Sequence, residues 1–196
     1  MKGMFRSALV VGLVLLPGAA GAQMRLVAGI GGGPTFPVKS GFNDQANTPT
    51  DINSLGYHLQ AMLGFQPAGR VGFRVDAQYG TIKYEEGVSG ARPRHKIFAV
   101  NADLVFHPSR QDAGVRPYLL AGPGYYSFQF DDGQTGDIND ADFNNVGVNG
   151  GAGLNLGRSD KVYFFIESRY IWTEDHRIIP VTVGIRINLS QPSTRR

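Results

Sequence analysis

The sequence predicts an all-β fold of eight antiparallel strands, and three observations support this prediction. No long segment repeats its apolar residues every three to four positions, as an amphipathic helix does. Stretches rich in Val, Ile, Tyr and Phe instead alternate apolar with polar residues, and turn residues separate them. The 27 glycines are spread through the chain without a collagen-like period. These features are typical of a β-barrel or a β-sandwich.

An N-terminal secretory signal peptide precedes the strands. Lys2 and Arg6 supply its positive charge, residues 8–16 its apolar segment, and Ala20-Gly21-Ala22 its small-residue cleavage site. The apolar run is too short to cross about 30 Å of membrane hydrocarbon as a helix. We therefore expect cleavage before Gln23 and export of the chain. The chain then divides into a signal peptide (residues 1–22), a strand-bearing domain (residues 23–190) and a polar C-terminal tail (residues 191–196).

The first four strands are justified by alternation. We expect them at residues 24–34, 55–65, 70–85 and 94–107. The first, VAGIGGGPTF, is rich in glycine, and the second, LGYHLQAMLGF, sets its large apolar residues on one face. The third, VGFRVDAQYG, alternates without a fault, as does FAVNADLVFH in the fourth.

The last four strands are expected at residues 116–130, 144–156, 161–173 and 177–189. The fifth, PYLLAGPGYY, is ambiguous because it carries apolar residues in both positions of the alternation, and Pro123 is unfavourable in a central strand. The sixth, seventh and eighth alternate clearly. Long and short connections partly alternate, as they do when one end of a barrel carries loops and the other carries tight turns. Only the seventh connection, residues 173–176, is shorter than this pattern requires.

Composition excludes several functional classes. The chain has no cysteine, and therefore no disulfide or thiol nucleophile. Without the signal peptide it has 17 basic and 16 acidic residues, and this near balance gives no reason to expect a nucleic-acid partner. No apolar run after the signal is long enough for a transmembrane helix, so a membrane location requires strands.

The polar face of the strands indicates that this face lies inside a closed barrel. A soluble barrel should present lysines and other long solubilising side chains there. This face instead carries Gly, Asn, Gln and Thr, which suit the confined interior of an eight-stranded barrel. Its charges balance, three of each sign, as a buried ion-pair network requires. The predicted lumen charge network comprises Arg74, Asp76, Asp103, Glu167, Arg169 and Arg186.

The apolar face would then contact lipid. A tilted transmembrane strand needs about 9–11 residues, which most of the predicted strands provide. Aromatic residues gather near the strand ends, as in the two interfacial belts of membrane barrels. One predicted belt contains Phe65, Phe73, Phe106 and Tyr118, and the other Tyr79, Phe128, Tyr170 and Trp172.

Four stretches resemble a known family: VAGIGGGPTF, PYLLAGPGY, FFIESRYIW and the final PVTVGIRINL. They are similar to the small eight-stranded outer-membrane β-barrels of Gram-negative bacteria, the OmpA/OmpX-like proteins. This resemblance implies an up-and-down transmembrane β-barrel in the cell outer membrane, with both termini periplasmic. It also implies contact with outer-membrane lipid and lipopolysaccharide and insertion by the barrel-assembly machinery. The assembly signal of the family would be Thr182, Gly184, Ile187 and Leu189, although the chain continues past Leu189 with a polar tail where the family usually ends on an aromatic residue.

Candidate chemistry is sparse, and we expect no cofactor and no metal. His58 is expected to face inward, His95 and His107 lie near strand ends, and His176 is expected in a loop; no pair has the spacing of a metal site. The acidic stretch DDGQTGDINDADF does not follow a calcium-loop pattern and is interpreted as an exposed loop. Lipid A deacylases resemble such barrels and pair a histidine with a serine on the lipid face. Ser168 faces outward here, but no histidine lies two residues from it.

The sequence therefore favours a non-enzymatic outer-membrane barrel with a structural or porin-like role. That role comprises envelope integrity, surface interaction through loops, or slow passage of small solutes. Two alternatives remain: a lipid-modifying barrel enzyme of the lipid A deacylase kind, and a soluble periplasmic binder resembling lipocalins.

Overall fold

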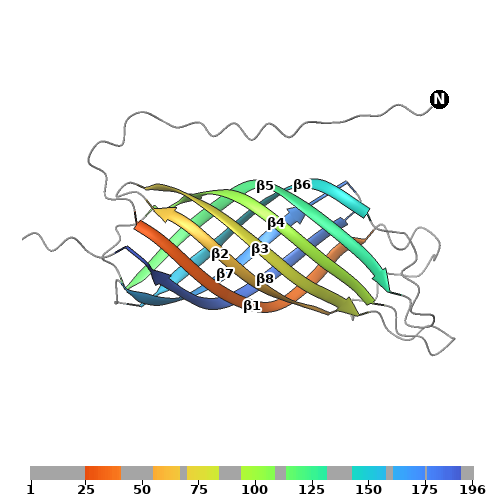
Figure 1. The fold of residues 1–196 in the computed structure, drawn as a ribbon, viewed down its shortest axis with the longest axis horizontal. Helices are drawn as coiled ribbons and strands as arrows, with labels where there is room; N and C mark the ends of the chain where they lie inside the picture. Colours follow the sequence, from red (N-terminus) through yellow and green to blue (C-terminus); the bar gives the residue numbers. More distant parts are fainter. Residues whose placement is uncertain are drawn as a thin grey trace, which may run out of the picture.

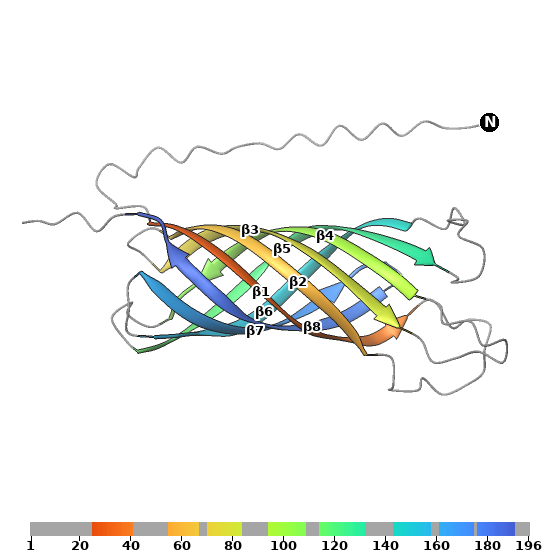
Figure 2. The same cartoon turned by 60° about the horizontal axis from the view of Figure 1, so that its bottom comes forward.

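The computed structural model describes residues 25–40, 55–66, 70–83, 94–108, 114–131, 143–157, 161–174 and 176–190. They form a closed antiparallel barrel whose strands follow chain order, with β8 paired to β1 (Figures 1 and 2). The strands are β1 (Arg25–Ser40), β2 (Gly56–Gln66), β3 (Val71–Lys83), β4 (Arg94–Phe106), β5 (Val115–Asp131), β6 (Phe143–Leu156), β7 (Val162–Trp172) and β8 (His176–Asn188). The predicted fold class, an all-β eight-stranded up-and-down barrel, is confirmed. In the described part of the chain, no helix is long and apolar enough to cross a membrane. The predicted signal peptide and C-terminal tail lie outside the described residues.

The two ends of the barrel differ in which strands finish at each of them. We call the end at which β1, β3, β5 and β7 finish the loop end, because residues 41–55, 84–93 and 132–142 connect strands there. The opposite end, where β2, β4, β6 and β8 finish, is the turn end. The first described residue, Arg25, and the last strand residue, Asn188, both belong to the turn end. The barrel therefore begins and ends on the same side.

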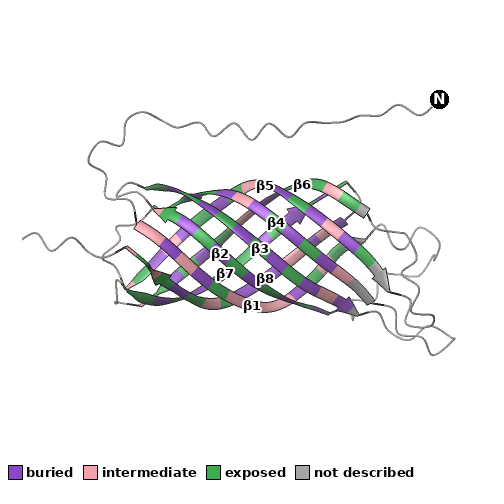
Figure 3. Cartoon of the chain, in the orientation of Figure 1, coloured by how far each residue is buried: buried purple, intermediate pink, exposed green. Residues whose placement is uncertain are grey.

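The outer wall of the barrel is apolar, and most of the charged side chains of the described strands face inward. Along β2 the exposed and buried residues alternate without a fault, with Leu59 70% exposed and its neighbour Gln60 3% exposed. Figure 3 shows the same alternation running around the wall. In β3 the apolar face, which includes Phe73 and Val75, is exposed, whereas Arg74 is buried. Because a water-soluble barrel would bury its apolar face, this arrangement is the one expected where the outside meets hydrocarbon.

Four of the prolines within the described strands lie at interruptions of the hydrogen-bonded ladders. Pro123 of β5 falls where the β4–β5 pairing skips from Gly124 to Ala121, and Pro180 of β8 where the β7–β8 pairing skips. Pro34 lies in a gap of the β1–β8 pairing, and Pro37 borders a register shift. Proline lacks a backbone N–H and is tolerated at such sites. The prediction that the first strand ends at Pro34 was therefore wrong, and β1 continues to Ser40.

Three side chains face the opposite way from the prediction. Tyr118 and Phe128 of β5, placed in the outer aromatic belts, are 1% and 2% exposed and face the lumen. His176, expected in a loop with outward parity, is the first residue of β8 and is buried against the Phe128 ring, with ring centroids 4.2 Å apart. The other predicted belt residues are exposed as expected: Phe65, Phe73, Tyr79, Phe106, Tyr170 and Trp172.

The interior is layered along the barrel axis. Near the loop end, seven inward residues form an apolar lumen cluster: Ile82, Ile97, Ala99, Tyr126, Phe128, Ile171 and Ile178. Toward the turn end follows a layer of buried charged residues, described below, together with a smaller apolar cluster of Val105, Tyr118 and Leu120. The lumen is thus filled by side chains, as an eight-stranded barrel requires.

Candidate functional site

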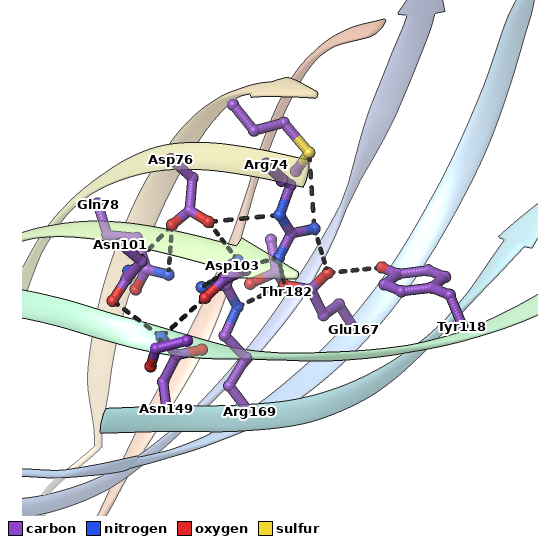
Figure 4. A network of polar contacts seen from close by, with 12 residues as sticks. Arg74, Asp76, Gln78, Asn101, Asp103, Tyr118, Asn149, Glu167, Arg169 and Thr182 are labelled. Atoms are coloured by element: carbon purple, nitrogen blue, oxygen red, sulfur yellow. Dashed lines mark hydrogen bonds and ion pairs between the residues drawn. The ribbon is translucent and has the colours of Figure 1, made fainter. Parts of the chain in front are cut away.

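The six charged residues predicted for the lumen all lie inside the barrel. Alternation along each strand directs their side chains inward, because residues two apart share a face. Arg74 and Asp76 come from β3, Asp103 from β4, Glu167 and Arg169 from β7, and Arg186 from β8. Each is at most 3% exposed. We call this set the ion-pair network. Figure 4 labels Arg74, Asp76, Asp103, Glu167 and Arg169 together with neutral partners.

Arg74 and Glu167 form a bidentate pair. The Arg74 Nη1 donates to Glu167 Oε2 at 2.7 Å, and Nη2 donates to Oε1 at 3.0 Å. In the closed order of eight strands, β3 and β7 are four positions apart in either direction, so they lie on opposite walls. This pair therefore crosses the lumen. Such planar fork-to-carboxylate contacts are among the strongest hydrogen bonds of proteins.

Arg169 contacts all three acidic members of the network. Its Nη2 lies 2.6 Å from Asp76 Oδ2, its Nη1 lies 3.1 Å from Asp103 Oδ2, and its Nε lies 2.6 Å from Glu167 Oε1. The contact with Asp76 is a second link between β7 and β3. Arg74 also approaches Asp76 and Asp103, at 3.4 Å in each case. The two arginines thus hold the three carboxylates between them.

Arg186 extends the network toward the turn end. Its Nη2 donates to Tyr118 Oη at 2.8 Å and lies 3.2 Å from Glu167 Oε2, and its Nη1 donates to Asn155 Oδ1 at 2.7 Å. The guanidinium also stacks on the ring of Phe165, 4.3 Å from its centroid. A cation over an aromatic face is attracted by the ring quadrupole, and this attraction grows when water is excluded.

Neutral side chains complete the network, and the sequence did not identify them as its members. Tyr118 donates its hydroxyl proton to Glu167 Oε2 at 2.6 Å. Asn101 donates to Asp76 at 3.0 Å, Asn149 donates to Asp103 at 2.9 Å, and Tyr126 donates to Asn101 Oδ1 at 2.6 Å. The inward parity of the two asparagines on β4 and β6 could have found them, because buried amides on a charged face need partners. Tyr126 joins the network to the apolar lumen cluster.

Two glycines provide the space that the network occupies. A Cβ at Gly153 of β6 would collide with the ring and hydroxyl of Tyr118, and a Cβ at Gly124 of β5 would lie 2.5 Å from Tyr126 Oη. Each tyrosine therefore packs directly against backbone. A larger residue at either position would displace a hydroxyl that donates a hydrogen bond within the network.

The positive and negative charges of the network are equal in number. Three arginines face three carboxylates, so the network carries no formal net charge. Removing charges from water is costly, and the mutual attraction offsets this cost only when the geometry is good and the remaining polar atoms are hydrogen-bonded. One guanidinium nitrogen of each arginine makes no hydrogen bond within the described part of the chain, namely Arg74 Nε, Arg169 Nη1 and Arg186 Nε, so the cost of burial is only partly offset by hydrogen bonds. The ion pairs join residues of four different strands. The network therefore constrains how the opposite walls of the barrel sit relative to each other.

The turn end of the lumen is lined by polar and basic side chains. Arg116 stacks over Tyr163 at 4.6 Å, and His107, which follows the last residue of β4, shares a hydrogen bond with Gln66 at 3.1 Å. Burial, and secondarily the charge of Arg186, lower the pKa of His107 to about 4. Two cavities in this region have volumes of about 10 and 20 Å³. Such volumes hold about one water molecule each.

The residues of the predicted assembly signal lie on or just after β8. Thr182 is buried and shares a hydrogen bond with His58 at 2.8 Å, while Ile187 and Leu189 are exposed on the outer wall. Gly184 lies against the backbone of β1, because a Cβ there would meet the Cα of Gly31 at 2.6 Å. The signal thus occupies the strand that closes the barrel against β1.

The other candidate residues do not form a recognisable catalytic or metal centre in the described strands. His58 faces inward as expected and bridges Thr35 and Thr182. Ser168 faces outward on β7, whereas His176 faces the lumen. No group of three or more His, Cys, Asp or Glu side chains could hold a metal ion among the described residues. The side chain of His95 and most of the predicted acidic loop lie outside them.

Side chains from opposite walls meet at two levels of the lumen. Side chains from opposite walls contact each other in the ion-pair network, and the apolar lumen cluster joins β3, β4 and β5 to β7 and β8 nearer the loop end. Side chains therefore occupy the lumen at two levels along its axis.

Comparisons with known proteins agree with this architecture. A family model described as "Outer membrane protein beta-barrel domain" matches residues 7–190. Neisserial surface protein A of Neisseria is 17% identical with a TM-score of 0.59, and the match covers 86% of this chain and 99% of that one. The N-terminal barrel domain of Pseudomonas aeruginosa OprF is 13% identical with a TM-score of 0.56, covering 86% and 99%.

A third solved structure, the outer membrane protein OprG of Pseudomonas aeruginosa, is 14% identical with a TM-score of 0.56, covering 86% of this chain and 96% of that one. At these identities the likeness establishes a shared fold. No curated protein matches the sequence.

Proposed function

Because the chain belongs to the outer membrane protein beta-barrel domain family, we propose that it acts as a closed structural barrel rather than as an open pore. It is an integral outer-membrane β-barrel protein. The observation that carries the proposal is the bidentate contact between Arg74 and Glu167, which joins opposite walls of the lumen. A water-filled passage at that level would require the two side chains to separate.

A second barrier supports the same conclusion. The apolar lumen cluster lies nearer the loop end, and its members Tyr126 and Phe128 are 0% and 2% exposed. An apolar constriction blocks ions because a hydrated ion must shed water to enter it. The ion-pair network and the apolar lumen cluster therefore oppose permeation in series, and slow passage of small solutes is the upper limit of the pore activity we expect.

Conductance across a planar lipid bilayer tests this function. We expect the wild-type barrel to conduct at least about ten-fold less than a variant in which both layers are trimmed, because a dewetted constriction stops ions. The trimmed variant carries Arg74→Ala, Glu167→Ala, Phe128→Ala and Ile171→Ala. Folding of both proteins is checked by the change in gel mobility on boiling. Wild-type conductance equal to that of the trimmed variant, or free passage of sugars in a liposome-swelling assay, contradicts the proposal.

The same structural role implies that the protein is not an enzyme. On the described outer wall Ser168 lacks a histidine partner, since His176 is directed into the lumen. A soluble lipocalin-like binder would need an apolar cavity inside, and here the interior is occupied by ion pairs. The mass profile of lipid A from cells with and without the protein should be identical. A loss or gain of one acyl chain would contradict the non-enzymatic role.

Membership of the family also supports a proposal for how the chain is exported and inserted into the outer membrane. We infer that residues 1–22 are removed, that both ends of the barrel face the periplasm, and that the outer wall contacts phospholipid and lipopolysaccharide. Sequencing the mature N-terminus should begin at Gln23. Thr182, Gly184, Ile187 and Leu189 are proposed as the assembly signal, supported by their place on the closing strand and its C-terminal extension.

A further inference from the structure

The outer wall of the barrel contains an apolar groove over β5, β6, β7 and β8. Its volume is about 420 Å³, which lies within the range of about 300–1,000 Å³ that is usual for ligand-binding clefts. The groove lies on the surface that meets lipid, and it extends to Pro108 and Pro117 near the turn end. It is more than twenty times larger than either cavity beside the lumen network.

The register of the strands explains the groove. Ala152 of β6 and Ser168 of β7 are directly paired and both exposed, so two small side chains sit side by side on the outer face. Leu119 of β5 pairs with Ala152, and Val181 of β8 pairs with Ser168, which places a larger residue at each end of this row. The adjacent outward row toward the turn end contains the larger pair Leu154 and Ile166. The groove is the depression that the two small residues leave between these larger side chains.

The lining of the groove selects an apolar occupant. Ser168 contributes the one hydroxyl among the outward side chains that line it. Glu167 also borders the groove, but its carboxylate is fully buried on the lumen side and bonded to Arg74 and Arg169. A charged headgroup would therefore find no charged partner among the outward side chains of the groove, whereas a hydrocarbon chain would gain close contacts along its length.

We infer that this groove binds one acyl chain of a phospholipid from the leaflet at the turn end. The groove is continuous with the lipid-facing wall, so hydrocarbon reaches it without crossing water. The groove extends to Pro108 and Pro117 near the turn end. That end faces the periplasm in the proposed orientation, where the leaflet consists of phospholipid rather than lipopolysaccharide. This inference rests on the outer-membrane location and on the proposed orientation of the barrel, and it is independent of whether the lumen conducts.

The experiment measures lipid retained by the intact barrel. The mature protein is refolded into vesicles of phosphatidylethanolamine and phosphatidylglycerol that also contain lipopolysaccharide, extracted with mild detergent and analysed by native mass spectrometry. We expect one retained phospholipid per wild-type barrel. Filling the groove with Ala152→Leu should lower retention about five-fold or more, which corresponds to about 1 kcal/mol of binding free energy.

The matched control is Ala77→Leu, which enlarges an exposed alanine on β3, on the wall opposite β7. It should retain phospholipid as the wild type does. Should Ala152→Leu fail to fold, as judged by gel mobility on boiling, the smaller change Ser168→Val takes its place. A phosphatidylethanolamine with a photoreactive group on one acyl chain provides a second readout, and we expect its crosslinks at Leu119, Leu154 or Ile166.

Three outcomes overturn the inference. One is equal retention by Ala152→Leu and Ala77→Leu, the second is retention of lipopolysaccharide in place of phospholipid, and the third is crosslinks spread evenly around the wall. None of these outcomes changes the expected conductance of the barrel, so failure of the groove and failure of the closed-barrel function are distinguishable.

Discussion

Arg74 on β3 and Glu167 on β7 stand on opposite walls of the barrel and meet through two hydrogen bonds of 2.7 and 3.0 Å. Both side chains are almost completely buried. A pair of this kind fixes the separation of the two walls, and each partner leaves a buried charge if the other is removed.

Removing one partner of the cross-lumen pair should destabilise the barrel strongly. For Arg74→Leu we expect a loss of about 3–5 kcal/mol in the free energy of unfolding, because Glu167 keeps a buried charge with fewer partners. Urea unfolding of the barrel in lipid vesicles measures this free energy. The double variant Arg74→Leu/Glu167→Leu should lose less than the sum of the two single changes.

The control for this series is Arg70→Leu, which removes an exposed arginine just before β3. We expect it to change the free energy of unfolding by no more than about 0.5 kcal/mol, as is usual for exposed positions. Equal losses for Arg70→Leu and Arg74→Leu would show that the network does not hold the walls together.

A methyl group at Gly153 should be far more harmful than one at Gly150 on the same strand. A Cβ at Gly153 meets the Tyr118 ring, whereas at Gly150 the nearest atom is 3.9 Å away. We expect Gly153→Ala to cost about 1–3 kcal/mol through overpacking. Gly150→Ala serves as the matched control and should be close to neutral. Unfolding midpoints in urea that are the same for both variants would contradict the packing of Tyr118.

Stability should fall as the pH decreases from about 6.5 to about 4, because of His107. The pKa of this buried histidine is lowered to about 4 in the folded barrel, from an ordinary value of 6.5. Between these values the unfolded chain binds the proton and the folded barrel does not, so acid favours unfolding. Replacing the ring with the non-titrating amide of His107→Gln should flatten this part of the stability profile. An unchanged slope over this pH range would show that other groups cause it.

Leu189→Ser should slow insertion more than it lowers stability, if the predicted assembly signal acts. Leu189 is 53% exposed, and its backbone N–H donates to Leu26 of β1 at 2.7 Å, a bond that serine can keep. The control is Leu63→Ser, at an outer residue of β2 with 52% exposure. Insertion is timed by the appearance of the heat-sensitive gel form in vesicles containing the assembly machinery. The same rate for both variants would argue against a signal at this position.

The sequence predicted the fold well because parity decides which face a strand residue occupies. The six charged residues of the network were identified in this way, since Arg74, Asp76 and their counterparts lie on the face opposite the large apolar residues. Which arginine meets which carboxylate could not be predicted. The pairing of arginines with carboxylates depends on the stagger between strands that are far apart around the barrel. The sequence of a single strand does not determine this stagger.

The sequence-based predictions were wrong at positions where the inward-facing residues are themselves apolar. Along β5 both positions of the alternation carry large apolar side chains, so Tyr118 and Phe128 were placed on the outside although they face the lumen. The apolar lumen cluster was missed for the same reason. The extension of β1 past Pro34 was missed because a proline is unfavourable inside a central strand. Pro34 is tolerated because it lies in a gap of the β1–β8 pairing, and this gap exists only in the assembled barrel.

The order of the two layers within the lumen has a consequence for what the cell keeps out. An ion that enters from the loop end must first lose its hydration shell among aromatic and aliphatic side chains, where nothing replaces the lost water. An oily molecule that tolerates that layer then meets guanidinium and carboxylate groups that already satisfy one another. The two classes of solute are thus rejected by different free-energy costs, and no single substitution in the lumen should admit both.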